Sequence, residues 1–308
     1  MAVFHQSDLS AWARCAAQFG YRKAGLPSKT NSAAAYGSVM HHALETLERE
    51  LHLDTPFPDA LATALETFAH YWSPINIDAI CEPVPADGWL PRQSQSSLRV
   101  KGLETIARYA DLIQYDDHEL LATEFNFIVP ITGTWDDELG EPHWLAGSVD
   151  RLASRFHLRL PVLYIDDFKT GKEYVGLRHN IQFTAYCYAS TRPEFWLGAR
   201  GEDGFGERGQ ALFERFDGKG RRGTWINLQK IKFQDAGWRG PTDYARFALA
   251  VSQMHAAMVA DVFPLSISGA VCGYCDYRAV CGGTGIAPPE HGNPKATDPA
   301  DRPVRVGA

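Results

Sequence analysis

The stretch that decides the fold class is VLYIDDFKT, residues 162–170, with HWLAGSVDRLA, residues 143–153, before it. Both stretches are rich in β-branched and aromatic residues and are bounded by turn signals, so they predict consecutive strands. A further strand is expected just upstream at 121–131 (LATEFNFIVPI). Three strands in succession at the centre of the chain place a sheet there.

Helical patterns surround these strands. The strongest is 34–52, where six apolar residues fall on one stripe at 3.6-residue spacing: Tyr36, Met40, Ala43, Leu44, Leu47 and Leu51. Other helices are expected at 6–20, 59–72, 96–114, 179–190 and 242–260. Further strands are expected at 195–199, 211–216 and 223–233, and the segment that follows the helix at 59–72, SPINIDAICEPVPADGWLPRQ, is typical of a long loop. The fold class is therefore mixed α/β, with a helical N-terminal part.

Composition sets the class of protein. The chain has 308 residues, 45% hydrophobic and 22% charged, as is ordinary for a soluble globular protein. It has no run of 18 apolar residues and no signal-peptide pattern, so we expect a cytoplasmic protein without membrane contact. In a reducing compartment, six cysteines favour metal ligation or free thiols over disulfides.

The net charge of -7 argues mildly against a nucleic-acid surface, but it does not decide the matter, because a metal-dependent site needs carboxylates. The best basic segments are GKGRRG (218–223) and the pair Lys230 and Lys232. Solvated turns and strand faces are the simpler interpretation of both.

The strand at 162–170 carries a chemically distinctive end. Side chains alternate along a strand, so Asp167 and Lys169 share one face, and Asp166 and Phe168 share the other. A tight hairpin would bring Asp150 close to Asp167. Two adjacent carboxylates repel, and a divalent cation with a preference for oxygen ligands, magnesium or manganese, relieves that repulsion. Lys169 could then orient and help deprotonate the attacking water and offset charge on a phosphate. A lone D-x-K is also compatible with a surface salt bridge.

The order of motifs makes the pattern specific. A G-x-x-x-H-x-x-x-E helix precedes GSVDR and DFKTG, and a Q-x-x-x-Y helix follows. This order, over residues 37–186, resembles the RecB-like branch of the PD-(D/E)XK nuclease superfamily. The resemblance implies a restriction-endonuclease-like core with a central mixed sheet flanked by helices.

The resemblance also implies residue roles. It assigns cation ligation to His41, Asp150, Asp167 and the backbone carbonyl of Phe168, catalysis to Lys169, and substrate positioning or support of the site to Gln182 and Tyr186. Glu124, Glu45 and Arg151 are further candidates that match less securely. Arg151 could neutralise phosphate or pair with a carboxylate. His42 is the alternative to His41, but it points about 100° away around the helix, and the family spacing selects His41.

Four cysteines lie near the two ends of the chain: Cys15, then Cys272, Cys275 and Cys281 in a C-x-x-C-x5-C pattern. Four thiolates can hold zinc or an iron–sulfur cluster, and spacing alone leaves both open. A subset of RecB-like nucleases, which includes AddB and the CRISPR-associated adaptation exonucleases, has one cysteine before and three after the nuclease motifs. That resemblance implies a structural 4Fe-4S cluster that joins the terminal segments. Cys81 and Cys187 are expected to be free thiols.

We therefore expect one nuclease domain over 1–287. It comprises a helical part at about 1–118, a core at about 119–260 and a cluster-binding segment at about 261–287 together with Cys15; a disordered tail follows at 288–308. The sequence has no G-x-x-x-x-G-K-[ST] phosphate loop, which helicases require. We therefore expect a stand-alone nuclease, or a nuclease subunit that works with the helicase motor of another protein.

The expected function is a magnesium- or manganese-dependent DNA exonuclease in recombination, repair or processing. Its substrate would be ends of single-stranded DNA, with 5′→3′ polarity implied by the family. Trp12, Tyr36 and Trp72 could stack bases, although core packing is the favoured role for each. The alternative is a non-catalytic DNA-end-binding or assembly subunit of a recombination or CRISPR-adaptation complex. A homo-oligomer and a partner protein both stay open.

Overall fold

The computed structural model describes residues 2–26, 31–73, 76–115, 118–136, 140–157, 159–171 and 180–266, and residues 272, 275, 277, 280 and 281. The chain divides into two compact units. The first unit comprises Met1–Lys29, Ile128–Gly147 and Gly240–Ala308, and the second comprises Thr30–Phe127 and Ser148–Arg239. A single domain over 1–287 stays a prediction, and the tail from residue 288 lies outside the described residues.

Helices and strands occur in separate runs along the described chain. The helices are α1 (Gln6–Arg14), α2 (Ala16–Lys23), α3 (Ser32–His52), α4 (Phe57–Tyr71), α5 (Gln95–Ile113), α6 (Ile181–Ala189), α7 (Pro193–Leu197), α8 (Gly209–Phe216) and α9 (Pro241–Ala260). The strands are β1 (Val3–His5), β2 (Glu119–Asp136), β3 (Glu141–His157), β4 (Leu160–Lys169), β5 (Arg221–Asn227) and β6 (Lys232–Trp238). Short 3-10 turns lie at Ile77–Ala79 and Ala86–Gly88, in the predicted long loop, and at Gly206–Arg208.

The strands form a mixed sheet in the order β1-β3-β4-β5-β6, with β2 also paired to β3. The β3–β4 and β5–β6 pairs are antiparallel, whereas β4 and β5 are parallel. The mixed α/β fold predicted from the sequence is confirmed. The β3–β4 register pairs Arg151 with Asp166, so Asp150 and Asp167 lie one position further along the two strands, as the expected hairpin requires.

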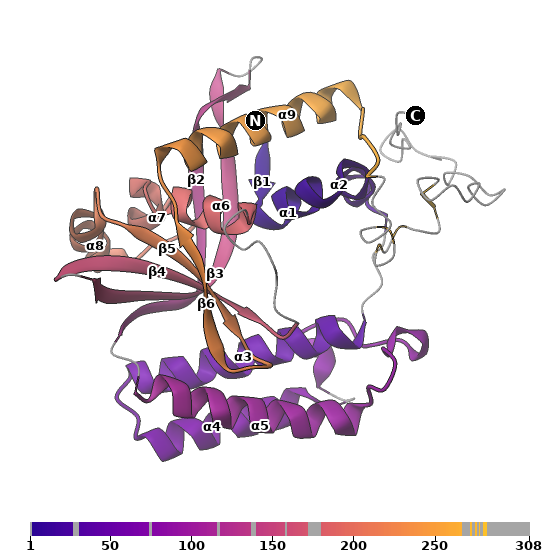
Figure 1. Ribbon diagram of the computed structural model, residues 1–308, viewed down its shortest axis with the longest axis vertical. Coiled ribbons are helices and arrows are strands. Elements are labelled where there is room, and N and C mark those ends of the chain that lie inside the picture. The colour runs from indigo at the N-terminus through magenta and orange to yellow at the C-terminus, as the bar shows by residue number, and fades with distance from the viewer. Residues whose placement is uncertain are drawn as a thin grey trace. The chain divides into compact units, whose positions relative to one another are not determined.

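In the second unit, α3, α4 and α5 lie side by side as a helical layer (Figure 1). The stripe predicted on α3 is buried from Tyr36 to Leu47, while Leu51 is half-buried at its end. Phe168 of β4 and Ile226 of β5 belong to the same apolar core as this stripe. The layer is therefore anchored to the sheet face that carries Phe168, and α3 is held beside the end of β4.

In the first unit, β1 pairs in parallel with the first half of β3, with Phe4 opposite Leu145. The single helix expected at 6–20 is wrong, because the chain breaks into α1 and α2 at Cys15. The backbone of Cys15 is extended, with φ -165° and ψ 116°, which turns the chain between the two helices and places this cysteine at their junction.

Three strand predictions needed correction. The strands predicted at 195–199 and 211–216 are wrong, because these residues contribute to α7 and α8. The single strand expected at 223–233 is a hairpin, with β5 and β6 on either side of a turn.

The basic segment GKGRRG does not present a row of exposed cations. Arg221 is buried and donates to the carbonyl and hydroxyl of Ser190. Arg222 forms an ion pair with Asp235 on β6. Both arginines of this segment therefore have protein partners, and Arg221 is buried rather than on a solvated face.

Two of the aromatic candidates for base stacking are core residues. Tyr36 and Trp72 are 4% and 2% exposed, so their rings cannot receive a base without opening the helical layer. Trp12 is half-buried and packs edge-on against Phe19. Among the described helices, none has the length and apolar character that a membrane span needs.

Candidate active site

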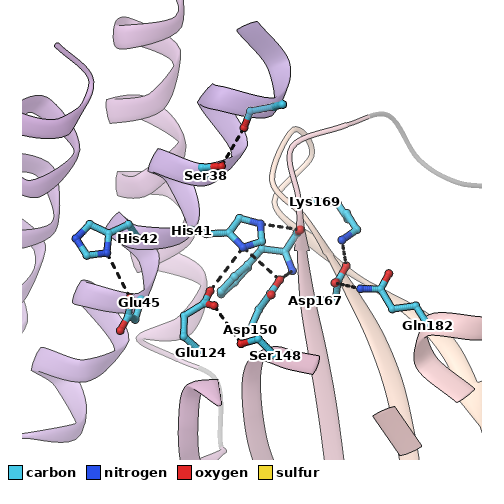
Figure 2. Close-up of polar contacts among 12 residues, drawn as sticks. Ser38, His41, His42, Glu45, Glu124, Ser148, Asp150, Asp167, Lys169 and Gln182 are labelled. Carbon is cyan, nitrogen blue, oxygen red and sulfur yellow. Dashed lines mark hydrogen bonds and ion pairs between the residues drawn. The ribbon is translucent and has the colours of Figure 1, made fainter. Parts of the chain in front are cut away.

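His41 stands at the centre of a group of polar atoms gathered from α3, β2, β3 and β4 (Figure 2). Its Nε2 lies 3.1 Å from the backbone oxygen of Phe168. Its Nδ1 lies 3.6 Å from Glu124 Oε1 and 3.5 Å from Asp150 Oδ2. The backbone oxygen and the carboxylates accept hydrogen bonds, so the arrangement favours an imidazole that is protonated on both nitrogens.

The charges around His41 and Asp150 shift both pKa values. Desolvation would lower the pKa of His41, but Asp150 and Glu124 outweigh it and raise the pKa to about 9. Burial raises the pKa of Asp150 to about 7, against the opposing effect of the His41 charge and with a contribution from Asp167. Without a bound cation, His41 and Asp150 therefore keep their protons to a higher pH than an ordinary histidine and aspartate do.

The backbone of Glu124 has an unusual conformation, which directs its side chain toward His41. It lies inside β2, yet its φ is +43°, in the left-handed region that a residue with a side chain rarely adopts in a strand. Such a kink re-aims a side chain, and it is maintained only where the surroundings fix it. The Ser148 hydroxyl lies 3.5 Å from Glu124 Oε2 and supports this orientation.

The ligand atoms of His41, Glu124 and Asp150 lie within 4.8 Å of one another. One imidazole nitrogen and two carboxylates form a donor set that suits a hard or borderline divalent cation. Asp150 is oriented by the backbone N–H of Phe168, which donates to its Oδ2 at 2.7 Å. The residues therefore fit a divalent cation.

A second group lies beside the first (Figure 2). Asp167 forms an ion pair with Lys169 and accepts from Gln182 Nε2 at 2.9 Å and from Trp225 Nε1 at 2.7 Å. Strand alternation therefore places Asp167 and Lys169 together, as predicted. Asp167 and Asp150 raise the pKa of Lys169 against the lowering effect of desolvation, so its side chain stays an ammonium at neutral pH.

Gln182 and Tyr186 act as a pair on α6. The Gln182 amide that donates to Asp167 also donates to the Tyr186 hydroxyl, at 3.0 Å. Tyr186 is 1% exposed, and burial raises its pKa well above the ordinary value. These contacts make Tyr186 a buried support for Gln182, and Gln182 an orienting donor for Asp167.

The site opens into a cleft of about 650 Å³. Side chains of α3 form one wall, and the end of β4 forms another. The lining residues are Ala33, Ala34, Gly37, Ser38, His41, His42, Glu45, Ile80, Glu124, Phe168, Lys169, Thr170 and Gly171. His41, Glu124 and Lys169 all reach this cleft, so a ligand there can contact both groups.

Three candidate residues have other partners. His42 points away from His41 (Figure 2) and pairs with Glu45, which also contacts Arg49. Arg151 is fully buried and pairs with Glu48 and Asp166. Of the two interpretations of Arg151, pairing with carboxylates is the one that the geometry supports.

Trp225 is the site contact that sequence reasoning missed. It lies on β5, opposite Asp167 in the parallel register, and no motif contains it. Only the strand pairing could have identified it.

The four cysteines of the terminal segments converge in the first unit. Cys15 Sγ accepts from the Ser266 N–H at 3.4 Å, and Cys272 Sγ contacts the Ser266 oxygen at 3.6 Å. Cys275 and Cys281 pack with Cys15 against Tyr21 and Tyr277 in one small core. Burial, followed by the proximity of Cys281, Cys15 and Cys275, raises the pKa of Tyr21 to about 12.

No disulfide joins any two of the six cysteines, all of which lie among the described residues. Four thiols around one helix junction form a donor set that fits a tetrahedral metal ion or an iron–sulfur cluster.

The family model of the PD-(D/E)XK nuclease superfamily matches residues 4–282. The chain belongs to this superfamily. Membership of this superfamily implies a metal-dependent nuclease whose substrate class is DNA. The group of His41, Glu124 and Asp150 agrees with this, because these residues could hold the metal. Among the solved structures that match is one described as "Crystal structure of SSO0001". It has 12% identity and a TM-score of 0.37, and the match covers 91% of this chain and 85% of that chain. No curated protein matches this PD-(D/E)XK chain.

Proposed function

We propose that this PD-(D/E)XK protein is a magnesium- or manganese-dependent deoxyribonuclease that degrades DNA from its ends, with single strands as the preferred substrate. One observation carries the proposal: two members of the three-residue cation donor group, His41 and Glu124, line the same cleft as the charged Lys169. A cation-dependent hydrolase of phosphodiesters needs both elements at one place.

The chain's own residues divide the work as follows. His41, Glu124 and Asp150 would hold the cation, and Asp167 and the Phe168 carbonyl would be further ligands. When bound, the cation supplies charge stabilisation at the phosphate and activates the attacking water. Gln182 and Trp225 keep the Asp167 carboxylate oriented, at 2.9 and 2.7 Å. Pre-oriented ligands and donors lower the reorganisation that the reaction requires.

Lys169 acts through its charge. Its neighbours raise its pKa, so it is an ammonium at neutral pH and cannot serve as a base there. An ammonium at the mouth of the cleft can hold the scissile phosphate and offset the negative charge that develops during in-line attack.

Three finer features rest on the family resemblance. They are the 5′→3′ polarity, the structural 4Fe-4S cluster on Cys15, Cys272, Cys275 and Cys281, and a partner or homo-oligomer in recombination, repair or CRISPR adaptation. Cys15, Cys275 and Cys281 share one small core, and Cys272 contacts the same Ser266 backbone as Cys15, which supports a shared metal centre. Visible absorbance of anaerobically purified protein separates the cluster from zinc, which is colourless.

The decisive experiment follows end-labelled single- and double-stranded DNA with magnesium, manganese or a chelator. We expect loss of label only with a cation, and the labelled end gives the polarity. Folded protein without activity under either cation would instead favour the non-catalytic DNA-end-binding subunit.

Replacing His41 should weaken cation binding selectively. We expect His41→Ala to raise the Kd for Mn²⁺ at least about tenfold, because even outer-shell partners of a metal contribute about 10–100-fold to its affinity. His42→Ala is a matched control, since the two side chains are similarly exposed, 28% and 30%, on the same helix. Calorimetric titration measures both, and equal loss in the two variants would contradict the assignment.

Cation affinity should rise with pH. The cation competes with the protons of His41 and Asp150, whose pKa values are about 9 and about 7. Ligands bind metal only when deprotonated. Affinity should therefore increase roughly tenfold per pH unit between about 7 and 9, as one proton leaves His41, and more steeply below 7. A Kd that does not change over this range would exclude His41 as a ligand.

A further inference from the structure

A buried network of polar and charged groups joins α3 and α5 to the strands β3 and β4. Arg151 Nε donates to Glu48 Oε1 at 2.8 Å, and Arg151 Nη1 forms an ion pair with Asp166. The Tyr109 hydroxyl also donates to Glu48 Oε1. None of these four side chains is more than 2% exposed, so the network has no access to substrate.

Each charged residue of the network is either the sequence neighbour of a proposed site residue or lies on the same side of a helix as one. Arg151 follows Asp150 on β3, and Asp166 precedes Asp167 on β4, so strand alternation turns each pair to opposite faces. Glu48 lies seven residues after His41 on α3, which puts both on one side of that helix. Arg151 therefore connects the three elements that carry His41, Asp150 and Asp167.

The network is a poor way to gain stability. Burying charges carries a large desolvation penalty, and well-packed apolar residues often replace a buried ionic group without loss of stability. Here Arg151 Nη2 and Asp166 Oδ1 also lack a hydrogen-bond partner among the described residues, which adds to that penalty. What the network supplies instead is fixed geometry, because the planar arginine side chain donates hydrogen bonds only in defined directions.

We propose that Arg151 is a positioning residue. Its bonds to Glu48 and Asp166 hold α3 against β3 and β4 at the separation that lets His41, Glu124 and Asp150 share one cation. The network thus sets cation affinity more than it sets the stability of the fold. This inference rests on the proposed cation-dependent function.

The test replaces the whole network by apolar residues, in the variant Glu48→Leu, Tyr109→Phe, Arg151→Met and Asp166→Leu. Cation-free protein is titrated with Mn²⁺, and the free ion is followed by its EPR signal; thermal unfolding is measured without cation. We expect an unchanged or higher Tm, a Kd for Mn²⁺ raised about 10–100-fold, and cleavage that recovers as Mn²⁺ is raised. A Kd equal to that of the wild type would overturn the inference.

A milder variant guards against loss of folding. Arg151→Lys keeps a buried positive charge but cannot bridge both carboxylates, and it should raise the Kd in the same direction. If neither variant folds, the network is required for stability and the inference is overturned. The control is Arg222→Met, which removes the exposed pair with Asp235, at 2.8 and 2.6 Å, and should leave the Kd unchanged. Wild-type protein that binds no Mn²⁺ would instead overturn the proposed function itself.

Discussion

Lys169→Ala should abolish most DNA cleavage and leave cation binding intact. The lysine contacts Asp167 through an ion pair and is 31% exposed at the cleft, where it can reach a phosphate without leaving the carboxylates. Removal of one preorganised charge or donor at a transition state lowers kcat by about 10²–10³-fold. We expect a loss of that size in the initial rate on end-labelled single-stranded DNA at saturating Mn²⁺.

The variant must be compared with one that removes a lysine elsewhere. Lys219→Ala removes an exposed lysine of the turn before β5 and should cleave at the wild-type rate. Calorimetry with Mn²⁺ should give similar Kd values for both variants. A Lys169→Ala rate close to that of the wild type would show that the lysine only pairs with Asp167, which is the surface-salt-bridge interpretation of a D-x-K motif.

The motifs predicted the arrangement of the sheet centre because their spacing is tied to strand geometry. The placing of Asp167 and Lys169 on one face and of Phe168 on the other follows from the two-residue period of a strand. The hairpin that brings Asp150 near Asp167 followed from two consecutive β-rich segments. Periodicity likewise predicted the buried stripe of α3, which fixes the side of the helix that faces the core.

Short apolar runs were ambiguous. Residues 195–199 and 211–216 contain enough aromatic residues to suggest strands, but runs of this length do not distinguish a strand from a buried helix. In α8, Leu212 and Phe216 are buried one turn apart, which is the helical spacing. The turn between β5 and β6 has no glycine or proline. It is closed by the Asn227 side chain, which accepts from the Lys230 N–H at 2.9 Å.

Parts of the site depend on tertiary contacts that no local pattern encodes. The positive φ of Glu124 re-aims its side chain from within a strand, and sequence alone suggested this residue only through the family resemblance. Trp225 reaches Asp167 because β5 pairs in parallel with β4 after a long connection. The partners of Arg151 come from α3 and β4, so the choice between phosphate and carboxylate needed the packed structure.

Replacing Cys275 by serine should remove both the metal centre and the folded protein. Cys15 and the C-terminal cysteines bracket nearly the whole chain, and a cross-link over so long a loop contributes roughly 5 kcal/mol by the loop-entropy estimate. A domain is stable by only about 5–15 kcal/mol. We therefore expect loss of visible absorbance, or of bound zinc, together with most of the soluble protein. Metal content, absorbance and soluble yield measure these effects.

Cys81→Ser separates a metal-linked effect from the general effect of removing a thiol. Cys81 is half-buried like Cys275, but it packs at the edge of the helical layer core and not with the other cysteines. Its serine variant should keep the wild-type metal content and yield, with at most a small loss of Tm, because only one polarisable atom changes. A Cys275→Ser protein that stays soluble, folded and active would show that the four thiols do not hold the terminal segments together. Loss of colour with retained folding would separate the two roles and leave the cluster without a structural purpose.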